Sequence, residues 1–399
     1  MMTRTNCWNL TFTGLLAALV SLSPLQAQAP RARDLGVPFS GTPAKFNAIT
    51  DVPGLAVGYS TLISGQGKLN VGQGPVRTGV TAIWPRGKQS VDSAFAGWYS
   101  QNGNGEMTGT TWIDESGFLD GPVLITNTHS VGVVRDAYIQ WQVDNNHPSG
   151  TDNLGGAEFF SLPVVAETFD GFLNDINGFH VKPSHAFQAL DTAAPGPVAE
   201  GNVGGGTGMI CYGFKGGSGT SSRVLDGALK GYTVGVFVQC NCGRRPQLQI
   251  AGVPVGLKIP EDVPYAKGSS WIQEDVGSII IVVATDAPLL PHQLKRLARR
   301  ATMGLARTGS TSGNGSGDIF VAFSTANTEA AKSSGLRDLK MLPNDEMNPL
   351  FEATVQATEE AIVNALVAAE TMTGVDNHRV IALPHQRLRE VLKEYNKLQ

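Results

Sequence analysis

The sequence predicts a layered α/β or α+β architecture, in which helices pack on the outer faces of β-sheets. Three features predict it: a continuous β-branched run over residues 278–284, an amphipathic helical pattern over 291–307, and a second long helical pattern from Pro349. The chain has 399 residues, 41% hydrophobic and 16% charged, so it can bury a large core without disulfides or metals. A formal net charge of -4 excludes a strongly basic nucleic-acid binder and any polybasic membrane patch.

The first two thirds of the chain contain short strand-like runs separated by Gly and Pro. Val123 begins one such strand, and Ser130 is expected to cap a helix that runs through Gln142. Alternating or continuous apolar runs predict further strands. These strands are expected at residues 55–59, 80–84, 123–127, 209–214, 232–242 and 247–252.

The last third begins with a Pro-rich stretch over residues 253–271, whose composition predicts an exposed loop. The run over 278–284 that follows it predicts a strand buried on both faces. In the helix over 291–307, one face is apolar and the other basic, and the basic face is more typical of a solvated surface than of an anion site.

Three further elements complete this part of the chain. The sequence predicts a strand over 319–324 and a last helix around 388–395. Between them, a long helix is expected with Asn348 as its cap, Pro349 in its first turn and Gly374 at its end.

The N-terminus has the pattern of a secretory signal over residues 1–29. Arg4 is the only charge before a mostly apolar run over 10–22, and Ala27-Gln28-Ala29 followed by Pro30 fits a cleavage site. A buried helix or a membrane anchor is the alternative, but the run is shorter than the roughly 20 residues that span a bilayer. We therefore expect a soluble protein, periplasmic or secreted, without a membrane partner.

Three cysteines remain once Cys7 leaves with the signal: Cys211, Cys240 and Cys242. Cys240 and Cys242 lie two apart in a predicted strand and should point to the same face. A metal pair or redox site is one interpretation. However, no second pair, nearby His or H-E-x-x-H spacing completes a zinc set, so small buried hydrophobic residues are favoured and no metal or cofactor is expected.

Two motifs suggest chemistry only weakly. The Gly-rich run over 204–208 could cradle a phosphate, but no Lys-Ser/Thr follows it, and the last glycine of G-x-G-x-x-G is missing. A tight loop beside a site is the better interpretation. His129 follows a predicted strand and could serve as a base, but no G-x-S-x-G elbow accompanies it, so a Ser-His-Asp triad is disfavoured.

A third motif is the Gly277-Ser278 pair, which lies between the Pro-rich loop and the buried strand. Glycine tolerates strained backbone, so the Ser278 hydroxyl could attack the Gly277 carbonyl and convert the peptide bond into an ester. Hydrolysis would free the α-amine of Ser278, whose unperturbed pKa of about 7.7–8.0 suits it as a base for its own hydroxyl. Because Gly-Ser before a strand is common, this motif alone does not decide the function.

Five ordered motifs lie along the chain, at residues 127–134, 162–168, 201–209, 277–288 and 312–320. Together they resemble the L-aminopeptidase D-esterase/amidase family, and within it most closely the exported β-peptidyl aminopeptidases. The likeness covers nearly all of residues 30–399. It implies a self-processing, N-terminal-nucleophile-like hydrolase with α-β-β-α layers. It also implies cleavage between Gly277 and Ser278 into an α chain, 30–277, and a β chain, 278–399, within one domain.

The resemblance also assigns roles to single residues. Ser278 is the nucleophile, Ser316 lies beside it, and Asp318 occupies a carboxylate position that holds Glu in the β-peptidases. Asn241 matches the oxyanion-hole residue and Glu167 the acid that binds the substrate amine. Without the resemblance, a turn serine, a turn-capping aspartate, a strand-end asparagine and a surface glutamate would be the ordinary interpretations.

The predicted function is a metal-free serine aminopeptidase that releases N-terminal residues, β-amino acids above all, from small peptides or amides with a free amine. We expect a homo-oligomer, a tetramer of αβ units, and no nucleic-acid partner. One alternative is an L-aminopeptidase with D-alanine esterase/amidase activity. Another is an ornithine acetyltransferase, which the Ser nucleophile and the signal segment disfavour. A non-enzymatic exported binding protein, expected as one intact chain, is the third.

Overall fold

The computed structural model describes residues 30–147, 160–264 and 277–398. The predicted signal over 1–29 and residues 265–276 of the predicted loop lie outside the described residues. Two sheets form the centre of the fold, with strand orders β1-β2-β5-β6 and β4-β3-β12-β11-β10-β9. The strands are β1 Ala56–Ser64, β2 Val76–Trp84, β3 Ala94–Gly103, β4 Phe118–Leu119, β5 Val123–Asn127, β6 Val164–Thr168, β7 Ile210–Cys211, β8 Phe214–Lys215, β9 Gly217–Val224, β10 Thr233–Asn241, β11 Ser278–Thr285, β12 Gly317–Ser324, β13 Met372–Thr373 and β14 Arg379–Val380.

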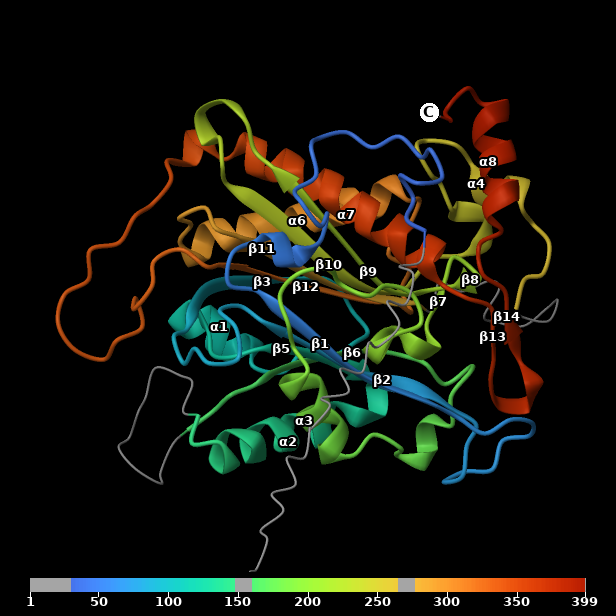
Figure 1. Cartoon of the computed structure of the whole chain (residues 1–399), viewed down its shortest axis with the longest axis horizontal. Helices are drawn as coiled ribbons and strands as arrows, with labels where there is room; N and C mark the ends of the chain where they lie inside the picture. Colours follow the sequence, from blue (N-terminus) through green and yellow to red (C-terminus); the bar gives the residue numbers. More distant parts are fainter. Residues whose placement is uncertain (1–29, 148–159, 265–276, 399) are drawn as a thin grey trace, which may run out of the picture.

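Helices cover the outer face of each sheet, which gives four layers in the order α-β-β-α (Figure 1). Helices α6 and α7 pack on the six-stranded sheet, and α2 and α3 pack on the four-stranded sheet. The layering predicted through the resemblance is thus confirmed. The helices are α1 Thr110–Ser116, α2 Val131–Asp144, α3 Pro183–Asp191, α4 Val255–Lys258, α6 Pro291–Arg307, α7 Asn348–Ala368 and α8 His385–Glu394. Within the described residues, none of the helices combines the length and apolarity needed to cross a membrane.

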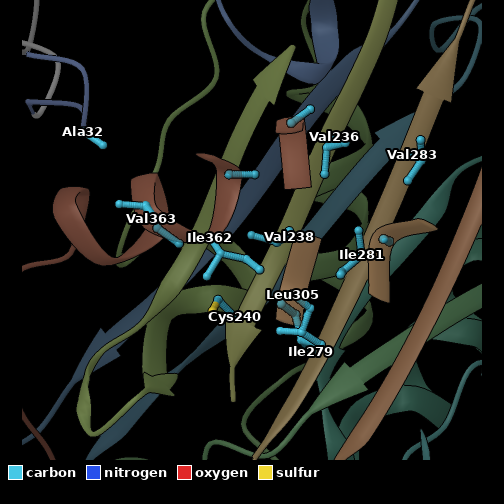
Figure 2. Packing of buried hydrophobic residues seen from close by; sticks show 14 of the residues in the cluster. Ala32, Val236, Val238, Cys240, Ile279, Ile281, Val283, Leu305, Ile362 and Val363 are labelled. Atoms are coloured by element: carbon cyan, nitrogen blue, oxygen red, sulfur yellow. The ribbon is translucent and has the colours of Figure 1, made fainter. Parts of the chain in front are cut away.

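Strand β11 shows why the sequence is continuously apolar there. It lies inside the six-stranded sheet, antiparallel to β10 and parallel to β12, and all of its residues are buried. Ile279 and Ile281 pack with the α6–α7 layer, where Leu305 and Ile362 meet them (Figure 2). Ile280 points to the opposite side, into the core between the two sheets. Both faces of β11 are therefore covered, as predicted.

Several predicted elements agree with the structure: β5 and α6 have the expected bounds, β11 and β12 extend theirs slightly, and α2 starts after Ser130. The predicted strand over 247–252 is wrong. That segment is a 3-10 turn, Arg245–Gln247, followed by an isolated bridge between Ile250 and Val253, because its backbone groups bond locally and to Thr308. The predicted strand over 209–214 is instead the β7–β8 hairpin, because Tyr212 takes a left-handed conformation and turns the chain.

Two expectations for loops and helix ends also need correction. The stretch after 253 is not simply exposed, because it contains α4, and Val255 and Ile259 are buried in the core. Helix α7 is preceded by Met347 rather than capped by Asn348, and it ends at Ala368 because Ala369 is extended. Gly374 lies beyond β13, where its missing side chain allows close approach to the Leu173 backbone.

Candidate active site

Ser278 is the first residue of β11, and its two neighbours across the sheet both carry hydrogen-bonding groups. Asn241 is its partner at the end of β10, and Gly317 is its partner at the start of β12. Side chains at directly opposed positions lie on the same face of a sheet, so the Asn241 amide lies beside the Ser278 hydroxyl. Ser278 is only 5% exposed and Asn241 6%, which makes the site a sheltered one.

The Gly317 N–H makes two contacts that matter for chemistry at Gly277-Ser278. It donates to Ser278 Oγ at 3.2 Å and to the Gly277 carbonyl oxygen at 3.3 Å. The hydroxyl and the carbonyl that it would attack thus share one backbone donor. Sequence reasoning missed this residue, because glycine offers no side chain to notice. A side chain there would lie 2.7 Å from Gly105 Cα, so the position requires glycine.

The Asn241 amide has a fixed orientation. Its Oδ1 accepts a hydrogen bond from the Ile210 N–H at 2.8 Å. Since the oxygen is engaged by a donor, the assignment of the two amide atoms follows from the hydrogen bond, and Nδ2 is the donor side of the group. An amide held in this way can donate to negative charge that develops near Ser278 Oγ.

Ser316 and Asp318 form a buried pair next to the same strand ends. Ser316 Oγ donates to Asp318 Oδ1 at 2.6 Å, a length typical of a hydroxyl bound to a carboxylate. Ser316 is 1% exposed and Asp318 is fully buried. The β12–β3 register shifts between Asp318 and Ile319, and such bulges redirect side chains beside functional sites. The 2.6 Å hydrogen bond shows that Asp318, although shorter than Glu, reaches the Ser316 hydroxyl.

Glu167 lies on β6 of the other sheet and is buried, so the surface-acid interpretation is wrong. Its Oε1 accepts from the Glu106 N–H at 3.0 Å, and its Oε2 accepts from the Thr128 hydroxyl. Burial raises the pKa of Glu167, although these two hydrogen bonds oppose the shift. Thr128 and Glu106 are partners that sequence reasoning did not identify.

Gly105 shows how close Glu167 lies to the strand ends that hold Ser278. A side chain at Gly105 would lie 3.2 Å from Glu167 Oε1 and 3.1 Å from Gly317 Cα. Gly105 therefore lies between the Glu167 carboxylate and Gly317, the partner of Ser278. The two sheets bring together an anionic group and a serine hydroxyl that are far apart in the sequence.

The weaker motifs do not form alternative sites. The Gly204–Gly208 run is a buried 3-10 turn whose N–H groups at Gly204 and Gly205 bond to threonine hydroxyls of the protein itself, so it is not a phosphate loop. His129 stacks on Phe179 with ring centroids 6.2 Å apart. Among the hydrogen bonds of the described ranges, none joins its ring to a serine, and a His-based triad gains no support.

The three cysteines gather behind the end of β10. Cys211 and Cys240 form a disulfide, so the interpretation of Cys240 as a small buried hydrophobic residue is wrong. The Cys242 sulfur lies 3.8 Å from each of the other two sulfurs, so Cys240 and Cys242 do share a face. This buried trio is the metal-ligand cluster found among the described residues. Three thiolates could hold a soft metal ion, but the disulfide leaves a thiol at Cys242 alone.

The sequence and fold both match known peptidases. Residues 47–380 match the model of peptidase family S58. The chain belongs to peptidase family S58. It is 56% identical over 398 residues to β-peptidyl aminopeptidase BapA of Sphingosinicella microcystinivorans, covering 98% of each chain. It is 49% identical over 399 residues to BapA of Sphingosinicella xenopeptidilytica, covering 97% of each.

Solved structures agree with this S58 assignment. The L-aminopeptidase D-Ala-esterase/amidase of Ochrobactrum anthropi, described as a prototype of the serine aminopeptidases and a variant of the Ntn hydrolase fold, matches with a TM-score of 0.84 and 48% identity. That match covers 93% of this chain and 100% of the other. A β-aminopeptidase from Burkholderia sp. matches with a TM-score of 0.82 and 46% identity, covering 92% and 99%. The predicted family, fold class and aminopeptidase activity are thereby confirmed, and a non-enzymatic binding protein is excluded.

Proposed function

We propose that this S58 aminopeptidase cleaves its own chain between Gly277 and Ser278 and then releases N-terminal β-amino acids from small peptides and amides. The observation that carries the proposal is the shared Gly317 N–H, which bonds to both the Ser278 hydroxyl and the Gly277 carbonyl oxygen. A donor in that place supports attack of the one group on the other.

Self-cleavage proceeds in two steps. Ser278 Oγ attacks the Gly277 carbonyl carbon, and the C–N bond breaks so that an ester joins Gly277 to the serine oxygen. Water then hydrolyses the ester, which leaves a carboxylate on Gly277 and frees both the hydroxyl and the α-amine of Ser278. The products are the α chain, 30–277, and the β chain, 278–399, which stay in one fold because β11 remains paired between β10 and β12.

Substrate turnover uses the same atoms. The Ser278 hydroxyl attacks the carbonyl of the first substrate residue, while its own amine takes the proton with help from Ser316 and Asp318. The Asn241 amide and the Gly317 N–H stabilise the oxyanion. Water then releases the N-terminal residue from the acyl-enzyme. No cofactor takes part in these steps.

Recognition of the free amine falls to Glu167. Its buried carboxylate is separated only by Gly105 from Gly317, the partner of Ser278. An exopeptidase needs such a group to bind the substrate's N-terminal amine beside the reacting carbonyl. A carboxylate paired with an ammonium makes a charge-assisted hydrogen bond that a blocked N-terminus cannot form. Blocked peptides should therefore be poor substrates.

A preference for β-amino acids is supported by the two BapA relatives, which are named for β-peptidyl substrates. The Ochrobactrum anthropi structure, at 48% identity, favours the alternative of an L-aminopeptidase with D-alanine esterase/amidase activity. Comparison of kcat/KM for β-alanyl and L-alanyl anilides decides between them. We expect the β-alanyl compound to be the better substrate, and a clear preference for the L-alanyl compound would favour the alternative.

We also propose that residues 1–29 are removed on export and that the mature enzyme is periplasmic or secreted and assembles as a tetramer of αβ units. The proposal rests on the signal pattern and the resemblance. Arg31 supports a mature chain that begins near Pro30, because its guanidinium bonds at 2.7 Å to the buried Glu200 and ties the first described residues to the fold. Cell fractionation with N-terminal sequencing tests the export, and light scattering tests the assembly.

A further inference from the structure

Lys215 is a fully buried lysine on β8 that the proposed mechanism leaves unused. Its Nζ donates to the carbonyl oxygens of Met209 and Gly216, each at 2.9 Å. Burial lowers the pKa of Lys215 to about 7, although the charge of Asp170 opposes this shift. Burying an amine is costly, and its two carbonyl acceptors offset only part of that cost.

The Met209 carbonyl that Lys215 holds belongs to the same peptide unit as the Ile210 N–H. That N–H donates to Asn241 Oδ1 at 2.8 Å. Because a trans peptide is planar, its C=O and N–H point in opposite directions. One rigid peptide unit thus connects Lys215 Nζ on one side with the Asn241 amide on the other. Hydrogen bonds linked in this way polarise one another, so the ammonium form of Lys215 at one end strengthens donation at the other.

We propose that Lys215 is a positioning residue for the Asn241 amide, which it orients and polarises through the Met209–Ile210 peptide. The proposal rests on the proposed function, in which Asn241 Nδ2 donates to the oxyanion. Lys215 Nζ and the Gly216 N–H both bond to the Met209 carbonyl oxygen at 2.9 Å, and Lys215 is the one of the two that can bring charge to it. The Ile210 N–H of the same peptide fixes Oδ1 of Asn241, which leaves Nδ2 to donate at the reacting centre. Lys215 itself touches neither the substrate nor Ser278.

Arg245 provides a control that distinguishes this positioning role from simple anchoring of the hairpin. Its guanidinium is also buried, and it donates to the Tyr212 carbonyl at 3.0 Å and the Gly213 carbonyl at 2.5 Å, which form the turn of the same hairpin. Among its hydrogen bonds within the part of the chain that the structure describes, none reaches the Met209–Ile210 peptide. Arg245→Met therefore removes a buried guanidinium that anchors the turn of the hairpin, together with its bonds to the Ile259 and Glu261 carbonyls, but leaves the link to Asn241 intact.

The test is a double-mutant cycle on the purified, self-processed enzyme with a β-alanyl anilide, or with the preferred amide substrate. Lys215→Met should lower kcat roughly 10- to 100-fold, the range for a misplaced oxyanion donor, with KM changed less than about threefold. Asn241→Ala should lower kcat by about 10²–10³. If Lys215 acts through Asn241, the double variant should be no slower than Asn241→Ala alone. Arg245→Met should lower the unfolding temperature and leave kcat near wild type.

The outcomes separate this inference from the proposed function. Additive losses in the double variant, an unchanged kcat for Lys215→Met, or an equal kcat loss for Arg245→Met would overturn the positioning role while leaving Asn241 in place. An unchanged kcat for Asn241→Ala would overturn both the positioning role of Lys215 and the proposed oxyanion role of Asn241. If Lys215→Met does not mature, Lys215→Gln replaces it in the same cycle, since its amide can still donate to a carbonyl without the charge. Lys215→Gln should then lower kcat less than Lys215→Met would, and it should cause no further loss when combined with Asn241→Ala. Additive losses in this double variant would overturn the proposal.

Discussion

Asn241 and Ser278 are directly paired residues of the antiparallel strands β10 and β11. The pairing places the Asn241 amide on the face between the two sheets, while its neighbours Cys240 and Cys242 point into the core beneath α6 and α7. Because side chains alternate along a strand, a slip of one residue in this register would remove the amide from the serine and put a cysteine there. The proposed oxyanion donor is thus set by sheet register.

Gly277→Ala should block self-cleavage. A side chain at Gly277 would contact the Asn241 carbonyl oxygen and lie 2.5 Å from Cys242 Cα, and backbone atoms cannot move aside as flexible side chains do. The Gly277 carbonyl would shift from the Gly317 N–H, and a displacement of about 1 Å costs roughly 10²-fold in rate. A time course on denaturing gels measures the cleavage. The control is Gly132→Ala, where nothing lies within 4 Å; cleavage of Gly277→Ala at the wild-type rate would argue against a fixed scissile geometry.

Glu167→Gln should lower kcat/KM on amine-bearing substrates by about one to two orders of magnitude. The change removes a charge-assisted hydrogen bond worth roughly 1.5–3 kcal/mol and keeps the size of the side chain. Self-cleavage should remain complete, since that step binds no external amine. An ester that lacks a free amine serves as the control substrate. Equal kcat/KM for both enzymes on amine-bearing substrates would mean that Glu167 does not hold the amine.

The same residue predicts an acid limit for activity. Burial raises the pKa of Glu167, so its carboxylate becomes neutral at a higher pH than an exposed glutamate does. The ionised form binds the ammonium, so kcat/KM should fall as pH drops through this raised pKa. A pH series compares the wild type with Glu167→Gln, which should lack this limb of the profile. An identical acid limb in the variant would assign it to another group.

Glu360 should hold the two proposed chains together. It lies on α7, in the β chain, and bonds at 2.7 Å both to Arg33 Nε and to Arg223 Nη2 of the α chain. Breaking such a buried pair costs about 3–5 kcal/mol, so Glu360→Gln should unfold at a clearly lower temperature. Glu359→Gln is the control, because its partner Arg307 is half exposed. Equal unfolding temperatures for the two variants would contradict this role.

The Glu360 contribution should also depend on pH. Burial alone would raise the pKa of Glu360, but hydrogen bonds from Arg33 and the charge of Arg223 outweigh it, and the pKa lies below its usual value. A lowered pKa in the folded state means that the stabilisation is complete above the unfolded pKa of about 4.3 and is lost as pH falls through the folded value. The difference in unfolding temperature between wild type and Glu360→Gln should therefore shrink as pH falls through the folded-state pKa of Glu360.

Thiol counting tests the cysteine cluster. In mature, denatured protein without reductant, one thiol, that of Cys242, should react with an alkylating reagent, and three should react after reduction. Chelators should leave activity intact, because the proposed mechanism uses no metal. Three reactive thiols without reductant, together with bound zinc and loss of activity in chelator, would instead make the cluster a metal centre.

Local patterns predicted those parts of the fold whose cause is local. Strand β11 and helix α6 followed from a buried β-branched run and a helical period, whereas the roles of the site residues followed from the resemblance of the motifs to a known family. The pairing of Cys211 with Cys240 and the approach of Glu167 to Gly317 depend on how distant segments stack, which periodicity does not encode. The Gly317 N–H was missed because backbone donors leave no side-chain signal. The predicted strand over 247–252 is wrong because apolar alternation also occurs in a buried turn.

N-terminal sequencing of the purified protein, wild type and Ser278→Ala, shows whether Ser278 cleaves its own chain. We predict two chains for the wild type, the smaller one beginning Ser-Ile-Ile-Ile at Ser278, and a single uncut, inactive chain for Ser278→Ala. A wild-type protein that is active as one intact chain, or a Ser278→Ala variant that still splits before residue 278, would contradict it.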